Sequence, residues 1–425
     1  MMNSVSSDQK TYRFLWGIPA PVWFLSIGMF CLNLSSVMVF ICMTLLTKMF
    51  SVRTSQLGSL EGVVDGFSLL MRAFSGLLSD FVRKRKRFLL LGYAICFFAR
   101  FLLAIAKVFD VVVFSRLLEK VGNGMQASPR EALIGDVTPS TSLGRAYGLN
   151  KTFGMLGSSL GSLLLLGLFY WNEHFDLRKI FLFAALMAGV SFFLLWVGVK
   201  EPPFSYPPHQ ASVLLSQRFQ VFLGELKEFS KDFWKATTMC FFLKMGYFSG
   251  IFMVTYVMAQ QFQTFLGFST SNKPLMSAAV LSLQNCLCAL FSYPGGYLSD
   301  LKDRRLTVFL GMICLLSSML SFGLGKGSAF WMVIGIIFYG LQYSMQGALM
   351  AFMSCTMPVR LQGTGFGLFF ITSGISMILS NLFIMNTVWD IYSPSTAFLV
   401  VCVPVTIALI ILPFIKMSKG ADKVA

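Results

Sequence analysis

The sequence predicts an all-α membrane protein in which twelve transmembrane helices form two pseudo-symmetric six-helix bundles. Three observations support this fold class. Apolar residues make up 56% of the 425 residues and charged residues only 12%, whereas soluble domains carry about 25% charged residues. The apolar residues gather in tracts of about 20 residues, which is enough to cross a bilayer. Landmarks of the first half of the chain also recur in the second half.

Twelve apolar tracts are candidate transmembrane helices, and Phe and Leu dominate them without the alternation typical of strands. They cover residues 22–46, 57–79, 88–107, 110–132, 146–170, 178–199, 237–262, 274–298, 306–325, 328–355, 364–388 and 394–416. The second and fourth tracts hold several charges. Both must nevertheless cross the membrane, because otherwise the neighbouring tracts could not alternate in direction. The first tract is longer than a signal-peptide core and lacks a cleavage pattern, so we expect it to be retained.

The distribution of basic residues predicts the orientation of the chain. The net charge is +16, which by itself would be compatible with nucleic-acid binding. If the N-terminus is inside, however, about 21 of the 34 Lys and Arg residues fall on the cytoplasmic side, as the positive-inside rule requires. We therefore interpret the run "RKRKR" at 83–87 as an orientation signal and predict no nucleic-acid partner. Both termini are expected in the cytoplasm.

Cysteine and histidine patterns predict no metal site and no cofactor. The nine cysteines all fall in apolar tracts, without a C-x-x-C pair and apart from the two loop histidines, His174 and His209. Free, buried thiols are the expected state. No nucleotide-binding loop or nucleophile elbow is present in the sequence. We therefore expect no enzymatic activity.

An internal repeat divides the chain into two halves. The longest polar interruption, residues 200–236, separates six tracts from six, which predicts bundles at 1–199 and 237–425 joined by a cytoplasmic linker. Four pairs of residues share an offset of 219 or 220 positions: Asp80 and Asp300, Gln126 and Gln346, Gly148 and Gly367, Pro139 and Pro358. A constant offset indicates duplication of a six-helix unit, a common architecture of transporters with a central substrate site.

The loops after the second and eighth tracts carry matching motifs, "GLLSDFVRKRKR" and "GYLSDLKDRRL". In these loops the chain resembles a major facilitator superfamily transporter, whose signature runs G-x-x-x-D-[RK]-x-G-[RK]-[RK]. The matching residues are Gly76, Asp80, Lys84 and Arg85 in the first copy, and Gly296, Asp300, Arg304 and Arg305 in the second. The departures are Phe81, Arg83, Leu301 and Asp303.

The stretch at 128–162 resembles a bacterial branch of the same superfamily, in which a Pro-Arg pair closes helix four and a Gly-Arg-Ala-x-Gly run opens helix five. The resemblance implies a multi-pass, monomeric secondary transporter of the inner membrane. Its partners would be a small-molecule substrate, the lipid bilayer and protons.

An aspartate ahead of a basic loop suggests a latch that holds in one conformation and breaks in the other. We expect Asp80, Arg83 or Lys84, Arg130, and either Glu131 or Asp136 to form this cytoplasmic latch, which would favour the outward-open state. The predicted gating set is completed by Gly76, Asp300 and Arg304.

Polar residues form stripes on two of the predicted helices. Helix two carries Glu61, Asp65, Ser68, Arg72 and Gly76, and helix four carries Arg116, Glu119, Asn123, Gln126 and Arg130. Spacings of three and four put each set on one helical face. Such faces must point to protein or water, because ionisable groups in lipid cost several kcal/mol.

Cations outnumber acids in the apolar tracts, which predicts an anionic or zwitterionic substrate. The internal cations are Arg72, Arg100, Arg116, Lys120, Lys151 and Lys244. We assign Arg72, Arg100 and Lys244 to an anion clamp, because arginine binds carboxylate or phosphate with two parallel hydrogen bonds. Further predicted substrate contacts are Asn33, Gln284, Asn285 and Gln346.

Asp65 and Glu119 are the predicted proton carriers, since a carboxyl in a water-poor site can exchange its proton near neutral pH. The alternative is structural pairing of Asp65 with Arg100 or Arg72, and of Glu119 with Arg116 or Lys120. At the level of function, the alternatives are a proton-coupled exporter of amphiphilic compounds and a non-transporting membrane sensor. Ser158 stands at the proline position of the superfamily's antiporter motif, which disfavours a drug/proton antiporter.

Overall fold

Long helices make up almost all of the described chain in the computed structural model. The structure describes residues 14–49, 68, 70–82, 84–171, 176–200, 226–247, 273–325, 328–380, 388 and 391–415. Two short strands, Phe14–Leu15 (β1) and Ile18–Pro19 (β2), pair antiparallel ahead of the first helix. The sequence showed no sign of this hairpin, because two-residue strands are too short to display alternation.

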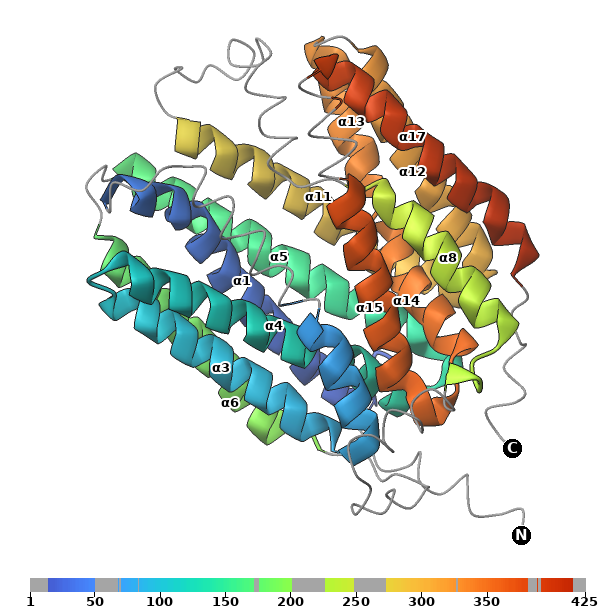
Figure 1. Ribbon diagram of the computed structural model, residues 1–425, viewed down its shortest axis with the longest axis horizontal. Coiled ribbons are helices and arrows are strands. Elements are labelled where there is room, and N and C mark those ends of the chain that lie inside the picture. The colour runs from blue at the N-terminus through green and yellow to red at the C-terminus, as the bar shows by residue number, and fades with distance from the viewer. Residues whose placement is uncertain are drawn as a thin grey trace.

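The first half of the chain forms one bundle, drawn from blue to green in Figure 1. Its helices are α1 (Ala20–Met49), the segment 70–82, α3 (Arg85–Ile105), α4 (Phe109–Val137), α5 (Leu143–Trp171) and α6 (Leu177–Gly198). Helix α1 packs on α5 and α6, and α3 packs on α4 and α6. Their apolar side chains form the inner contacts, as expected for helices that are hydrophobic on nearly all sides.

The second half repeats this arrangement. Its helices are α8 (Lys231–Met245), α11 (Lys273–Leu301), α12 (Arg304–Leu324), α13 (Ala329–Leu341), α14 (Ser344–Thr356), α15 (Gln362–Leu379) and α17 (Pro394–Ile411), with the single turns η3 (Val359–Leu361) and η5 (Leu412–Phe414). A further single turn, η2 (Ser140–Ser142), precedes α5 in the first half. Helix α12 packs on α13 and α17, and α8 packs on α15 and α17.

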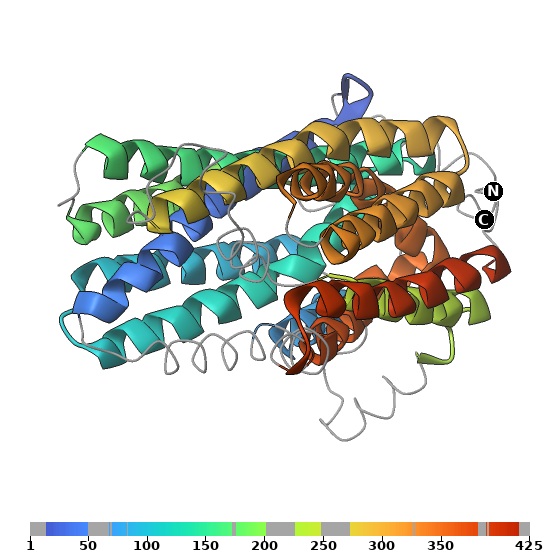
Figure 2. The same cartoon turned by 90° about the horizontal axis from the view of Figure 1, so that it is seen from above.

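The two halves meet along α5 and α11, which run side by side in Figures 1 and 2. Helix α14 also packs on α5, and α15 packs on α4. Each half therefore contributes its own helices to a shared seam. This seam positions the candidate site described below.

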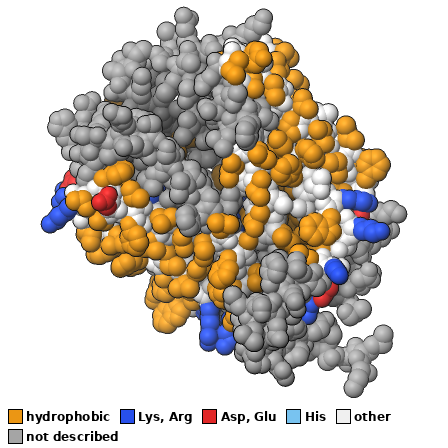
Figure 3. All heavy atoms as spheres, viewed as in Figure 1, with side chains coloured by type: hydrophobic (Ala, Val, Ile, Leu, Met, Phe, Trp, Pro, Cys, Tyr) orange, Lys and Arg blue, Asp and Glu red, His pale blue; other side chains and the backbone are white. Residues whose placement is uncertain are grey.

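Eight of the described helical stretches are long and apolar enough to cross a membrane. Large apolar side chains are exposed on their outer faces, including Phe98, Phe193, Leu290 and Val403. Figure 3 shows such side chains covering much of one face of the molecule. An all-helical, twelve-span membrane fold accounts for this surface, since exposed apolar groups are stable against lipid and not against water.

Two helices differ from their predicted bounds, and one expectation about the cysteines is wrong. The predicted span 328–355 is two helices, because the chain turns more tightly at Gln342 and Tyr343, between α13 and α14. Helix α4 continues to Val137 with Pro129 inside it. Cys286 is exposed, and Cys314, Cys355 and Cys402 are only partly buried, so the expectation that all thiols are buried is wrong at these positions. Most of the predicted span 57–79 and the end of 237–262 lie outside the described residues.

Candidate functional site

Asp80 links the first half of the chain to the second. It lies at the end of the helical segment 70–82 and is almost fully buried. Its Oδ1 accepts a hydrogen bond from the Gly363 backbone N–H at 3.0 Å, and its Oδ2 accepts one from the Thr364 N–H at 2.6 Å. These groups open α15. The carboxylate thus satisfies two donors that a helix leaves without intrahelical partners, and it complements the positive end of the helix dipole.

Asp300 makes the reciprocal contact from the second half. Its Oδ1 accepts from the Gly144 N–H and its Oδ2 from the Arg145 N–H, both at 2.8 Å. These groups open α5. The Arg145 side chain adds a contact from Nε to Oδ2 at 3.3 Å, and Arg304 lies 3.5 Å from Oδ1. Arg304 also donates to the Ser140 carbonyl, so this arginine too crosses between the halves.

Close backbone contact accompanies both caps. A Cβ added to Gly76 would lie 2.3 Å from the Gly363 carbonyl oxygen, and one added to Gly296 would lie 2.2 Å from the Gly144 carbonyl oxygen. Only glycine permits backbones to approach this closely. The two halves are therefore closed against each other at this end, which we call the latch end, defined by Asp80, Asp300 and the helix starts that they cap.

The basic partner of Asp80 is Arg85. Its guanidinium donates to Asp80 at 3.0 Å and lies 2.9 Å from Asp136. The prediction that Lys84 pairs with Asp80 is wrong, because Lys84 is exposed at the N-terminal cap of α3. Helix α3 begins at Arg85, and this residue is the one that points inward. Arg83 lies outside the described residues.

Arg130 and Glu131 belong to a second group, in the interior of the first half. Lys151 donates to Glu131 Oε1 at 2.6 Å, and Arg130 Nη2 donates to the same oxygen at 3.3 Å. Arg130 also donates to Gln126 at 3.0 Å. The expectation that Arg130 and Glu131 join Asp80 is not met, because Glu131 binds Lys151 of α5 and Arg130 binds Met29 of α1, Gln126 and Glu131.

Two further cations belong near this group: Arg72, from segment 70–82 of the first half, and Lys244, from the second half. Lys151 interacts electrostatically with Arg72 and with Lys244 of α8. The Arg72 guanidinium lies over the ring of Phe370, on α15, at 5.1 Å from its centroid. We call the group the central cationic cluster; its members are Arg72, Arg130, Glu131, Lys151 and Lys244. It holds four cations and one carboxylate, and both halves contribute to it.

Neutral polar groups surround Lys244. Its ammonium lies 4.2 Å from the centre of the Tyr247 ring, a cation–π contact. The Tyr247 hydroxyl donates to Gln342 Oε1 and accepts from Gln346 Nε2, both at 2.5 Å. Gln342 stands at the break between α13 and α14, which turns its amide toward α8.

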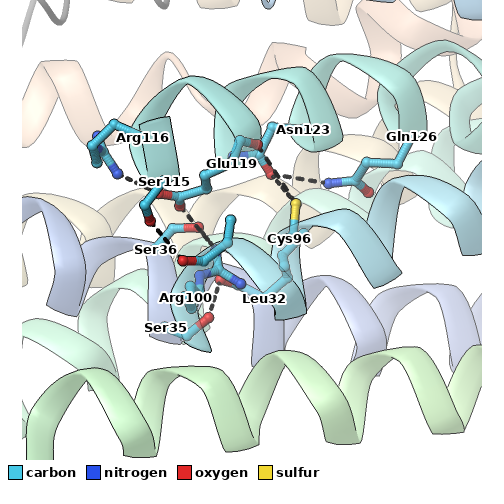
Figure 4. Close-up of polar contacts among 11 residues, drawn as sticks. Leu32, Ser35, Ser36, Cys96, Arg100, Ser115, Arg116, Glu119, Asn123 and Gln126 are labelled. Atoms are coloured by element: carbon cyan, nitrogen blue, oxygen red, sulfur yellow. Dashed lines mark hydrogen bonds and ion pairs between the residues drawn. The ribbon is translucent and has the colours of Figure 1, made fainter. Parts of the chain in front are cut away.

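Arg100 lies in a separate group, shown in Figure 4. It is fully buried, and its Nη2 donates to Glu119 at 3.1 Å and to Ser36 at 2.6 Å. Arg116 also donates to Glu119. The expected pairing of Glu119 with Arg116 is observed, whereas the clamp that combined Arg100 with Arg72 and Lys244 is not assembled, because α1, α3 and α4 enclose Arg100.

The remaining predicted residues are dispersed. Asn33 donates to the Gly154 carbonyl at 3.1 Å and joins α1 to α5. Gln284 is buried and Asn285 half-buried on α11. Gln346 belongs to the Tyr247 network. Asp65 lies outside the described residues.

Sequence reasoning missed the capped helix starts. Gly144 and Gly363 are 219 positions apart and stand in similar runs, "GRAYG" and "GTGFG". Asp80 and Asp300 are related by an almost equal offset of 220 positions. Extending the repeat to these glycines would have identified both caps.

Two six-helix bundles that enclose buried cations and close at one end by reciprocal helix caps define a secondary-transporter fold. The chain belongs to the Major Facilitator Superfamily, whose family model matches residues 24–381. It is 27% identical to an uncharacterized MFS-type transporter of Methanocaldococcus jannaschii over 397 residues, which are 93% of this chain and 94% of the relative.

Two solved structures share the fold. The human organic anion transporter MFSD10 (TETRAN) has a TM-score of 0.74 at 14% identity and covers 92% of this chain and 98% of its own. The proton:xylose symporter XylE has a TM-score of 0.73 at 14% identity, and the match covers 94% of this chain and 96% of XylE. At this identity, both likenesses concern the fold alone.

Proposed function

We propose that the protein is a secondary active transporter that carries a small anionic or zwitterionic solute across the inner membrane by alternating access. The observation that carries this proposal is the central cationic cluster. Four cations and one carboxylate lie between or beside the two halves. A ligand that brings negative charge would neutralise the excess.

The energetic argument rests on burial. An ionised group removed from water loses several kcal/mol of solvation unless opposite charge and hydrogen bonds replace it. Within the described residues, Glu131 is the one acid that pairs with Lys151 and Arg130, and Lys244 makes no ion pair. An anion placed between Lys151 and Lys244 would compensate both cations.

Polar groups of the second half could supply hydrogen bonds for the rest of the solute. Gln342 Nε2, next to Tyr247, and Gln284 Oε1, on α11, are buried and make no hydrogen bond to a described residue. Buried amide atoms are normally satisfied, so these two are candidate contacts for a bound solute. They add Gln342 to the proposed substrate residues Arg72, Lys244, Gln284, Asn285 and Gln346.

Alternating access follows from the position of the latch end. The caps by Asp80 and Asp300 exist only while the halves are in contact at this end. We expect this end to face the cytoplasm, because the basic residues of the sequence gather on that side; in that orientation the described conformation would be closed to the cytoplasm. A solute bridging Lys151 and Lys244 would stabilise the closed arrangement of both halves and thereby drive the switch.

Proton coupling is proposed for Asp65, Glu119 and Glu131. Glu119 is held between Arg100 and Arg116, so a proton role requires these arginines to move during the cycle. Glu131 Oε2 is buried and accepts no hydrogen bond from a described residue. Its other oxygen binds Lys151, which a solute could draw away, leaving the carboxylate to take up a proton.

Uptake by the purified protein in sealed vesicles, with and without a pH gradient, tests the proposal. The expected result is accumulation of an anionic or zwitterionic solute that increases with the gradient and disappears with an uncoupler. Accumulation of cationic solutes only would contradict the assigned substrate class. Absence of uptake for every class, by protein that still binds solute, would favour a membrane sensor.

A further inference from the structure

A groove runs between α8 and α17, on the outside of the second half and away from the central cationic cluster. It has a volume of about 470 Å³ and is lined by Lys231, Trp234, Lys235, Thr238 and Ile411. Its walls come from one end of each helix. No step of the proposed transport cycle uses these residues.

The groove lies at the latch end of the molecule. Ser230, just ahead of Lys231, donates to the carbonyl of Thr356. Thr356 is followed by η3 and then by the start of α15, which Asp80 caps. On the other wall, Lys235 donates to the Phe414 carbonyl at 3.2 Å. Trp234 is 42% exposed and Phe414 is 67% exposed. Aromatic side chains at such a level are typical of the membrane–water boundary.

The two helices are adjacent in Figure 1, where the start of α8 and the end of α17 lie at the same side. Figure 3, in the same view, shows basic side chains next to the hydrophobic surface at that side. The groove thus joins an apolar surface to a basic rim. These are the two environments that a phospholipid needs.

The rim carries a positive excess. Lys231 is exposed and makes no ion pair with a described residue. Lys235 has one acidic neighbour, Asp232, at 3.6 Å. Glu228, the other acid nearby, is bound by Arg360 at 2.6 Å. Lys231 therefore remains available to a phosphate, and the Lys235 ammonium, which has three N–H donors, keeps one beyond its contacts with Asp232 and the Phe414 carbonyl.

We propose that this groove binds an anionic phospholipid, with the phosphate between Lys231 and Lys235 and an acyl chain along Trp234 and Ile411. Lysine binds phosphate as a point charge, and basic pockets between helices at the cytoplasmic surface recognise acidic headgroups. The N-terminus of α8 adds partial positive charge at the same place. The apolar side chains of Trp234 and Ile411 would contact an acyl chain, which a free anion does not have.

Lipid binding to the full-length, delipidated protein tests the site. The probes are phosphatidylglycerol and phosphatidylcholine with identical acyl chains, and the variant is Lys231→Gln/Lys235→Gln. Because each lysine near an acidic lipid contributes roughly a fivefold factor, the double variant should lose about thirtyfold in affinity for phosphatidylglycerol. Affinity for phosphatidylcholine should hardly change.

The matched control is Lys200→Gln/Lys302→Gln, which removes two exposed lysines outside the groove. It should bind phosphatidylglycerol as the wild type does, and Lys231→Arg/Lys235→Arg should retain most of the affinity. Equal losses in the control and the groove variant would overturn the proposal. They would show that net charge alone attracts the lipid.

Quenching of Trp234 locates the lipid directly and does not depend on charge variants. Phosphatidylglycerol brominated on its acyl chain should quench the wild type more than Trp234→Phe. Equal quenching of the two proteins would place the lipid elsewhere. If inorganic phosphate displaced the lipid at equal concentration, the groove would be an anion site and the lipid assignment would be wrong.

Discussion

Asp80 and Asp300 make the same contact half a chain apart: each carboxylate accepts hydrogen bonds from two successive backbone N–H groups that open a helix of the opposite half. A duplicated sequence thereby closes one end of the molecule with two equivalent caps. Because each cap crosses between the halves, both must break when this end opens.

Asp300→Asn should shift the protein toward the conformation that is open at the latch end. An amide N–H₂ cannot accept from a backbone N–H, and a hydrogen bond to a charged group contributes about 1.5–3 kcal/mol. The ratio of closed to open molecules should therefore fall about tenfold or more. Distances between spin labels at Lys84→Cys and Lys302→Cys, in a cysteine-depleted background, measure this ratio.

Asp303→Asn is the matched control for that experiment. Asp303 caps α12 through the Arg305 N–H, so its loss removes a helix cap within one half only. Its distance distribution should remain that of the parent. If Asp303→Asn opened the latch end as much as Asp300→Asn, reciprocal capping would not be the cause.

Gly296→Ala should prevent full closure of the latch end. The new methyl group would lie 2.2 Å from the Gly144 carbonyl oxygen and 3.1 Å from the Gly148 Cα. These are backbone atoms, which cannot move aside without separating α5 from α11. We expect transport to be nearly abolished while the protein remains folded, measured by vesicle uptake and melting temperature.

Gly167→Ala provides the comparison, since a Cβ there meets nothing within 4 Å. It should transport normally and unfold at an equal or higher temperature, because alanine favours a helix by about 1 kcal/mol over glycine. Normal uptake by Gly296→Ala would show that the halves need not approach so closely.

Glu119→Gln should destabilise the fold more than it alters substrate affinity. It would leave Arg100 and Arg116 buried without their carboxylate, at a cost of about 3–5 kcal/mol. Adding Arg100→Gln should recover part of the melting temperature. If Glu119→Gln is stable but no longer accumulates solute along a pH gradient, Glu119 carries protons and is not mainly a structural partner.

Tyr247→Phe should weaken solute binding without unfolding the protein. The hydroxyl joins Gln342 and Gln346, and its loss leaves two buried amides to reorient. An amide that reorients would lose its hydrogen bond to the solute, worth roughly 1 kcal/mol, so we expect the dissociation constant to rise up to about tenfold. Unchanged solute affinity in isothermal titration would remove this network from the site.

The helices could be predicted from the sequence because apolar tracts of membrane-spanning length leave few alternatives. The latch aspartates could also be predicted, since Asp80 and Asp300 share an offset and a motif. Their partners could not, because whether Lys84 or Arg85 faces inward depends on the residue at which α3 begins. A one-residue shift rotates a side chain by about 100°, since a helix has 3.6 residues per turn.

The composition of the candidate site was only partly predictable. Helical spacing put Arg72, Glu119 and Arg130 on inner faces, but spacing within one helix says nothing about which helices are neighbours. Arg100 was therefore assigned to the clamp, although the packing of α3 on α4 places it against Glu119. Lys151 was counted among the cations, but its contact with Glu131 depends on the packing of the helices and was not foreseen.

Solute binding by Lys244→Gln tests the central claim most directly. A panel of anionic, zwitterionic, neutral and cationic solutes should reveal binding of anionic or zwitterionic members to the wild type, and Lys244→Gln should lose about tenfold or more in that affinity while its melting temperature holds. Lys235→Gln, on the same helix but outside the cluster, should bind as the wild type does. Preference of the wild type for cationic solutes, or unchanged affinity in Lys244→Gln, would contradict an anion site between the two halves.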